Sequence, residues 1–206
     1  MIDLLSLPLQ EARAIVEQWT AARGDPGYRV RQILPRLWAR PVRSWDEATD
    51  LPAGLRSALA ESFPLTGLTL GTHQASTDGT QKFLWLLADG DAIESVLIPE
   101  GRRRTLCISS QVGCALGCIF CATGRMGFRR NLSAGEIANQ VRELVLRDPV
   151  ARPTNVVFMG MGEPLLNWPA VDAALSILND PEGLGIGARH ITVSTAGVAG
   201  STTRRC

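Results

Sequence analysis

The amino-acid sequence predicts an α/β protein with a small helical domain, then antiparallel strands, then alternating strands and helices. Three observations support this order. Apolar residues recur at helical spacing up to about residue 66, short apolar runs separated by Asp-Gly pairs follow up to about residue 104, and strand-like and helix-like stretches then alternate. We therefore expect domains at 1–66, 67–104 and 105–197, with residues 198–206 as an atypical tail.

Three helices are expected in the first part. Apolar residues at three- and four-residue spacing mark residues 9–19, 30–38 and 55–63. The sequence Gly-Asp-Pro-Gly at 24–27 separates the first two helices, and Pro52 stands near the first turn of the third. These features predict a small helical domain.

The next segment is expected to form antiparallel strands at 68–75, 81–88 and 93–98. Asp78-Gly79 and Asp89-Gly90 lie between these runs, and Asp-Gly pairs favour the tight turns of hairpins. The segment therefore predicts a three-stranded antiparallel unit.

After residue 104 the pattern predicts a strand, a helix, a strand, a helix and a strand. The expected ranges are 105–109, 134–146, 155–159, 168–178 and 190–194. Such alternation implies right-handed crossovers and a parallel sheet. Ser133 and Glu136 have the spacing of a capping box at the start of the first of these helices.

Three of the five cysteines, Cys114, Cys118 and Cys121, lie within eight consecutive positions. This spacing suits metal ligation better than a disulfide framework. Three thiolates leave one iron of a 4Fe-4S cluster open for a substrate. A zinc site or buried free thiols are the alternatives, although zinc would need a fourth ligand, and His73 and His190 are distant in sequence.

Charge neither supports nor excludes a nucleic-acid partner, because Lys and Arg number 21 against 20 for Asp and Glu. Local groups of arginines could bind RNA phosphates, and an ordinary solvated surface is an equally good interpretation of them. The arginines near the cysteines are Arg102, Arg103, Arg104, Arg125, Arg129 and Arg130, and those of the helical part are Arg29, Arg31, Arg36, Arg40 and Arg43.

No apolar run approaches the length of a membrane span, so we expect a cytoplasmic protein.

Three motifs in order carry a family resemblance: TLCISSQVGC at 105–114, GFRRNL at 127–132 and NVVFMGMGEP at 155–164. With the CxxxCxxC spacing, they resemble the RlmN and Cfr family of radical S-adenosylmethionine (SAM) RNA methyltransferases, over residues 29–197. The resemblance implies the first half of a partial (β/α)6 barrel, a 4Fe-4S cluster and SAM. In the family, SAM cleavage yields a 5′-deoxyadenosyl radical, which abstracts hydrogen from a methyl group carried on a cysteine. The resulting carbon radical adds to adenine.

The resemblance also implies roles for the cofactor-binding residues. The three clustered cysteines would hold the cluster, Gly162 and Glu163 would meet the amino-acid end of SAM, and Ser194 would contact SAM. Taken alone, residues 159–164 would be an ordinary Gly-Pro loop, and Ser194 would be a cap residue at a strand end.

Two further residues acquire catalytic roles by resemblance. Glu94 would be the general base that removes a ring proton, and its apolar neighbours could raise its pKa. Cys107 would be the thiol that releases the product as a disulfide. Without the resemblance, Glu94 would be a solvated charge on a strand and Cys107 a small buried residue.

The implied activity is methylation of carbon 2 of adenosine in 23S rRNA and in tRNA, with an electron donor such as flavodoxin or ferredoxin. Methylation at carbon 8, another radical SAM reaction and a non-catalytic cluster-binding fragment remain alternatives. Family members continue through further strand–helix units that carry the methyl-bearing cysteine. We expect a frameshift or early stop to have replaced them, with Cys206 a chemically idle thiol and the last strand left with an unpaired edge.

Overall fold

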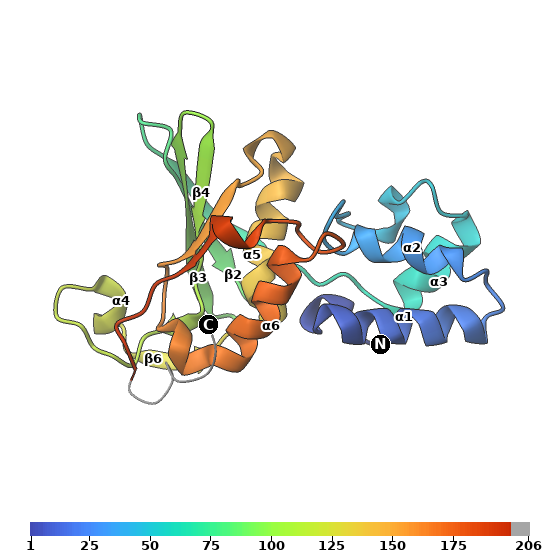
Figure 1. The fold of residues 1–206 in the computed structure, drawn as a ribbon, viewed down its shortest axis with the longest axis horizontal. Helices are drawn as coiled ribbons and strands as arrows, with labels where there is room; N and C mark the ends of the chain where they lie inside the picture. The colour runs from blue at the N-terminus through green and yellow to red at the C-terminus, as the bar shows by residue number, and fades with distance from the viewer. Residues whose placement is uncertain (199–206) are drawn as a thin grey trace.

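A six-stranded mixed sheet forms the centre of the computed structural model, which describes residues 1–198 (Figure 1). The predicted tail from residue 199 onward, with Cys206, lies outside the described residues. The strand order is β1-β2-β3-β4-β7-β8, antiparallel from β1 to β4 and parallel from β4 to β8. The predicted α/β class is therefore confirmed. The strands are β1 (Thr69–Ala75), β2 (Gln81–Leu86), β3 (Ala92–Glu100), β4 (Arg103–Cys107), β7 (Asn155–Phe158) and β8 (Ile191–Val193).

The two faces of the sheet differ in burial because side chains alternate along each strand. Ile93, Leu97, Leu106 and Val156 point into the core. Helices α5 (Ala134–Arg147) and α6 (Trp168–Asn179) cover this side and belong to the same core (Figure 1). The opposite side carries mostly half-buried residues, such as Glu94, Val96 and Cys107, and we call it the open face.

Helix α5 begins where the capping box was expected. The Ser133 hydroxyl accepts a hydrogen bond from the Glu136 amide at 3.1 Å, and the Glu136 carboxylate accepts one from the Ser133 amide at 2.8 Å. Two otherwise unpaired backbone donors are thereby satisfied. The next crossover helix, α6, also follows its predicted range closely.

The helical part contains α1 (Leu9–Ala22), α2 (Tyr28–Ile33) and α3 (Ala53–Ser62). The second helix is shorter than expected. A 3₁₀ turn at Leu34–Arg36 replaces its second half, because Pro35 has no backbone N–H to donate to the preceding turn. No helix among the residues that the structure describes is long and apolar enough to cross a membrane.

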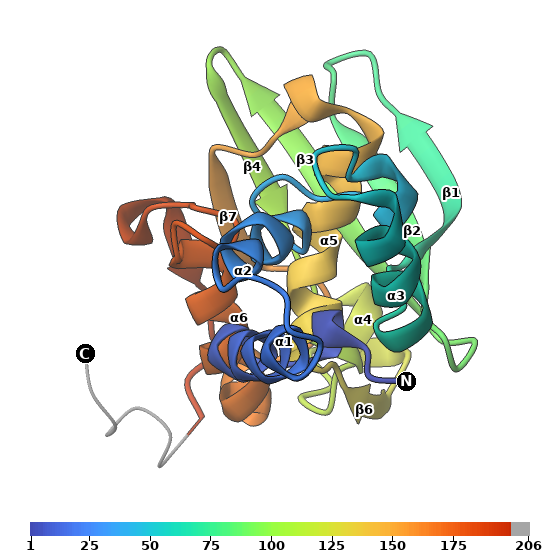
Figure 2. The ribbon, with the colours of Figure 1, turned by 90° about the vertical axis from the view of Figure 1, so that its right-hand side faces the viewer.

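The helical part packs directly on α5, in front of which α1, α2 and α3 lie in Figure 2. Arg142 of α5 is fully buried and donates from Nε to the Leu37 carbonyl at 2.9 Å and from Nη2 to the Val42 carbonyl at 2.6 Å. Its third contact is an ion pair with Glu143 at 2.8 Å. These bonds fix the segment after α2 against the helix that covers the sheet.

Candidate active site

The three clustered cysteines lie on a loop that a short hairpin closes. The hairpin consists of β5 (Gln111–Gly113) and β6 (Phe128–Asn131), which the sequence analysis did not predict because each run is too short to show a period. Gly113 has φ of 74°, and a Cβ there would overlap the Gly127 carbonyl, which accepts from the Cys114 amide at 3.0 Å. We call residues 114–127 the cysteine loop.

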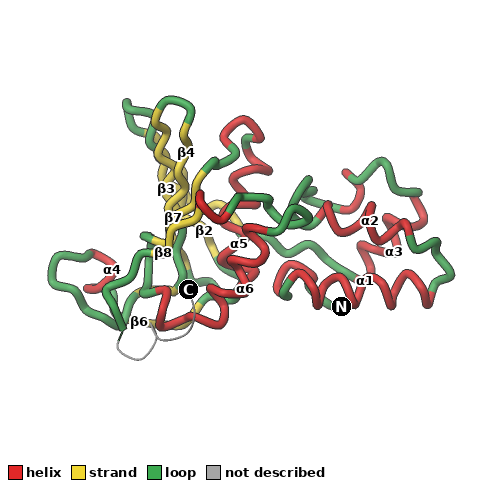
Figure 3. The backbone as a smooth tube through the Cα atoms, viewed as in Figure 1, coloured by secondary structure: helices red, strands yellow, loops and turns green. Residues whose placement is uncertain are grey.

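The thiols of the cysteine loop are free. Cys114 is buried, whereas Cys118 and Cys121 are half-buried, and helix α4 (Ala122–Arg125) follows directly (Figure 3). Ile119 and Phe120, between the last two cysteines, are 85% and 89% exposed. Over residues 1–198, no three His, Cys, Asp or Glu side chains are gathered closely enough to hold a metal ion.

The donor chemistry of the cysteine loop fits an iron–sulfur cluster better than zinc. A structural zinc site usually takes four Cys or His ligands, and the loop offers three thiols. The two histidines are engaged elsewhere: His73 contacts Gln81 at 3.0 Å and His190 contacts Asn155 at 3.2 Å. Three thiols are the donor set that leaves one iron of a 4Fe-4S cluster without a protein ligand.

The loop after β7, residues 159–163, packs against the segment that leads from β4 to the cysteine loop. The Gly160 amide donates to the Ile108 carbonyl at 3.0 Å, and the Ser110 amide donates to the Met161 carbonyl at 2.8 Å. Gly162 has φ of 101°, and a Cβ there would overlap the Gln111 side chain. Glycine is therefore required for this close approach. We call residues 159–163 the glycine loop.

Glu163 is only 3% exposed, and its carboxylate already accepts three hydrogen bonds. The donors are the Thr195 hydroxyl at 2.6 Å, the Ala196 amide at 2.9 Å and the Leu165 amide at 3.0 Å. The carboxylate thus ties the chain after β8 to the glycine loop. Its expected pairing with the ammonium group of SAM stays a prediction.

The sequence analysis did not identify two residues that contact Glu163, namely Thr195 and Gln111. Thr195, next to the predicted Ser194, supplies the hydroxyl that contacts Glu163. Gln111 accepts from the Glu163 amide at 2.9 Å and donates to Asn131 at 2.8 Å, which joins the glycine loop to β6. No local pattern identifies either residue, because their partners lie 20 to 52 residues away.

Replacing Glu163 by glutamine is expected to lower the free energy of unfolding by about 1–3 kcal/mol. The amide nitrogen of glutamine cannot accept, so the Thr195 hydroxyl or the Ala196 amide would lose its acceptor. Urea unfolding followed by circular dichroism measures this change. Glu61→Gln on the exposed last turn of α3 is the control, and equal stability of both variants would contradict the tether.

Glu94 and Cys107 share the open face of the sheet. Cys107 pairs in register with Val96, so Glu94 is its diagonal neighbour on β3. The prediction that apolar residues surround the Glu94 carboxylate is wrong. Its side chain is 43% exposed and forms an ion pair with Lys82 at 3.0 Å. The apolar neighbours Ile93 and Leu97 point to the other face because strand side chains alternate.

Cys107 is half-buried, and burial raises the pKa of its thiol. Less of it is thiolate at a given pH, and thiolate is the reactive form. In the metal-free protein at pH 7.5 (roughly one unit below the pKa of a free thiol) we expect iodoacetamide to modify Cys118 before Cys107. Peptide mass spectrometry over time measures the order. Faster modification of Cys107 would contradict it.

The predicted arginine patch is largely engaged within the protein. Arg130 contacts Asp89 at 2.6 Å and both carboxylate oxygens of Glu136 at 2.8 and 2.9 Å, so its guanidinium is already paired within the protein. Asp89 lies 41 residues before Arg130 in the sequence, and Glu136 lies in the first turn of α5. Arg129 pairs with Asp91 at 2.9 Å but remains 70% exposed. Further internal contacts are made by Arg36, Arg43, Arg103, Arg104 and Arg125.

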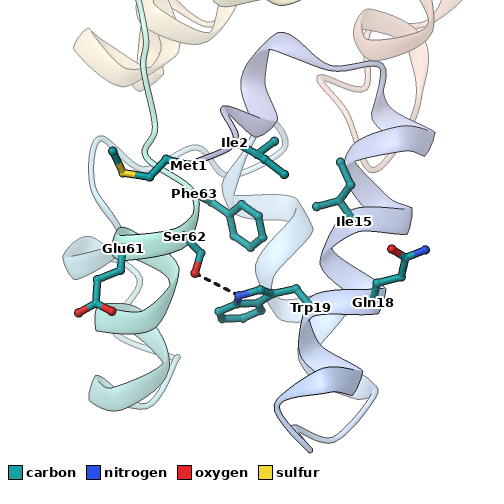
Figure 4. Close-up of a pocket in the computed structure, with 8 residues that line it drawn as sticks. All are labelled: Met1, Ile2, Ile15, Gln18, Trp19, Glu61, Ser62 and Phe63. Carbon is teal, nitrogen blue, oxygen red and sulfur yellow. Dashed lines mark hydrogen bonds between the residues drawn. The ribbon is translucent and has the colours of Figure 1, made fainter.

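A separate pocket lies in the helical part between α1 and α3 (Figure 4). Trp19 donates from Nε1 to the Ser62 hydroxyl at 3.1 Å, and its ring meets Phe63 edge to face at 5.3 Å. None of the predicted site residues lines this pocket. Its lining residues are Met1, Ile2, Ile15, Gln18, Trp19, Glu61, Ser62 and Phe63.

Three free thiols close together along the chain, on a loop beside the parallel part of the sheet, are a donor set that suits an iron–sulfur cluster. Comparison with known proteins agrees. The sequence model of the Radical SAM superfamily matches residues 108–204. The crystal structure of a radical SAM methyltransferase from Sphaerobacter thermophilus superposes with a TM-score of 0.85 at 45% identity, covering 96% of this chain and 58% of that one.

Two similar relatives with assigned functions are RNA methyltransferases. The chain is 61% identical over 196 residues to the probable dual-specificity RNA methyltransferase RlmN of Gemmatimonas aurantiaca, covering 95% of this chain and 54% of the relative. It is 48% identical over 205 residues to the corresponding protein of Heliobacterium modesticaldum, covering 95% and 52%. Nearly the whole chain is therefore homologous to RlmN proteins, and residues 108–204 match the model of the radical SAM superfamily. The chain spans about half the length of the curated relatives that it matches.

Proposed function

We propose that this chain carries the part of an RlmN-type RNA methyltransferase that binds the 4Fe-4S cluster and SAM. The closed cysteine loop, held against the glycine loop through residues 108–111, carries the proposal. The substrates proposed by family resemblance are 23S rRNA and tRNA, methylated at carbon 2 of adenosine. Resemblance assigns the methyl-bearing cysteine to the half of the relatives that this chain does not match, so the proposal for this chain concerns cluster binding and SAM cleavage.

Each part of the site has a proposed task. Cys114, Cys118 and Cys121 would hold the cluster, which when bound supplies the electron that cleaves SAM. The glycine loop offers backbone groups at the carboxyl end of β7, the edge at which parallel sheets bind ligands. Ser194 follows β8 at the same edge and is proposed to contact SAM.

The open face of the sheet is proposed to receive the adenine. Glu94 is exposed there and would accept the ring proton, with the Lys82 ammonium beside it at 3.0 Å. Cys107 lies diagonally across on β4 and would provide the thiol that releases the product. Both residues project from adjacent strands, so the proton acceptor and the thiol share one surface.

Proposed partners follow the same resemblance. In this proposal residues 1–66 are a helical accessory domain, residues 67–104 an antiparallel unit and residues 105–197 the barrel part. The helical accessory domain would help to bind RNA. The protein would act in the cytoplasm. Arg31 and Arg40 of the helical part are candidates for phosphate contacts. The electron would come from a small redox protein such as flavodoxin or ferredoxin.

Anaerobic reconstitution with iron and sulfide, followed by electron paramagnetic resonance (EPR) of the reduced protein, tests the proposal. We expect a 4Fe-4S signal that changes when SAM is added, and release of 5′-deoxyadenosine with dithionite as reductant. A protein that takes up zinc but no iron–sulfur cluster would contradict the proposal. So would a cluster whose signal SAM leaves unchanged.

A further inference from the structure

Gln140 of α5 is a fully buried polar residue to which the sequence analysis assigned no role. Its Oε1 accepts from the Ser109 amide and from the Ser95 hydroxyl, both at 2.8 Å, and its Nε2 donates to the Ser109 carbonyl at 2.8 Å. The amide group thus pairs with the backbone of Ser109 through two hydrogen bonds, as a neighbouring strand would.

The position of Ser109 gives this pairing its importance. The ladder between β3 and β4 ends at the pair of Val96 and Cys107, and the chain then leaves the sheet toward the cysteine loop. Ser109 therefore lies just beyond the last ladder pair, where a buried backbone amide would lack a partner on β3. Gln140 supplies that partner from the helix that covers the sheet.

The Ser109 hydroxyl extends the same network to two parts of the candidate active site. It donates to the Glu94 carbonyl at 2.7 Å and accepts from the Met161 amide at 2.9 Å. One buried serine thus contacts the strand of the proposed base and the glycine loop, and it lies five positions before the first cluster cysteine. Trp85 completes the network by donating from Nε1 to the Ser95 hydroxyl at 3.1 Å.

We propose that Gln140 is a positioning residue that holds Glu94, the start of the cysteine loop and the glycine loop in one fixed arrangement through Ser109. The role rests on the proposed function, because the arrangement matters for SAM binding. The mutual geometry of the site is then set from behind the sheet, by a side chain that touches neither cofactor nor substrate. Buried networks with every group paired are the kind that impose a single geometry.

Two variants weaken the network at different points. Gln140→Met keeps a similar length and removes all three bonds to Ser109 and Ser95. Ser109→Ala removes only the contacts to Glu94 and Met161. Ile137→Ala is the matched control, because Ile137 is also fully buried on α5 and its side chain has no polar group that could bond to the site.

Amide hydrogen exchange of the Met161 region in the cofactor-free protein tests the placement directly. We expect exchange to be about tenfold faster in Gln140→Met and in Ser109→Ala than in the wild type, the size of one lost buried hydrogen bond. After correction for global stability, Ile137→Ala should leave this exchange unchanged. Wild-type exchange rates in Gln140→Met, or an equal increase in the control, would overturn the inference.

SAM affinity of the reconstituted chain is the second readout. Gln140→Met should bind SAM roughly tenfold more weakly with an unchanged iron content, and adding Ser109→Ala should weaken binding little further, since coupled residues are not additive. Full additivity would overturn the inference. If the wild type binds no SAM, the proposed function fails, while the exchange comparison still decides whether Gln140 positions the loops.

Discussion

Replacing Cys118 by alanine is expected to abolish cluster binding by this chain. Iron content after anaerobic reconstitution should fall from about four atoms per chain to background, and the EPR signal should disappear. The reason is that the cysteine loop provides three thiols and both histidines are engaged elsewhere, so among residues 1–198 no further Cys or His lies in the loop to replace the lost ligand. Iron and sulfide analysis of the purified variant measures the effect.

Cys107→Ala is the matched control for this experiment. Cys107 is also a free cysteine, but it lies on β4 and pairs with Val96 inside the sheet, outside the cysteine loop. We expect this variant to keep its full iron content. Loss of iron in Cys107→Ala together with retention in Cys118→Ala would contradict the assignment of the cluster to the loop.

Replacing Arg142 by methionine is expected to destabilise the protein by about 3–5 kcal/mol, the cost of leaving a buried charge without its partner. The substitution removes the ion pair with Glu143 and the hydrogen bonds to the Leu37 and Val42 carbonyls. The helical part should then detach from α5 more easily. Chemical unfolding measures the stability, and limited proteolysis between α2 and α3 measures the detachment.

The loss in Arg142→Met should depend on pH. Burial already raises the pKa of Glu143 from its ordinary value of 4.5, and removal of the arginine raises it further. The folded state then binds a proton more tightly than the unfolded state, so stability is retained below pH 4.5 and lost as the pH rises through the folded pKa. The deficit of the variant should therefore be larger at pH 7 than at roughly pH 5.

A double variant separates the charge effect from the lost contacts. Arg142→Met with Glu143→Leu removes the buried carboxylate as well, so part of the stability at neutral pH should return. The two carbonyls at Leu37 and Val42 would still lack their donors, and recovery should be incomplete. Identical stability of the single and double variants at pH 7 would contradict the role of Glu143.

Much of the molecule follows from local sequence patterns. The capping box of Ser133 and Glu136, the crossover helices and the strands near their predicted ranges all depend on residues within one turn or one strand. The cysteine loop was likewise recognisable, because its three thiols lie close together along the chain. Helix α2 was overestimated for a local reason, the effect of Pro35, which the apolar period does not reveal.

Contacts between distant segments were decided only by the tertiary structure. The sequence by itself determined the α/β class and the cysteine loop, because apolar periods and cysteine spacing along the chain encode them, whereas family resemblance singled out the glycine loop. Only the fold buried the Glu163 carboxylate against Thr195, paired Arg130 with Asp89, turned Glu94 outward and set Gln140 against Ser109. Each of these depends on which face and which partner a side chain meets. The face and the partner of each side chain are fixed only when the whole core packs. A buried polar group then pairs with a partner that can come from any part of the chain.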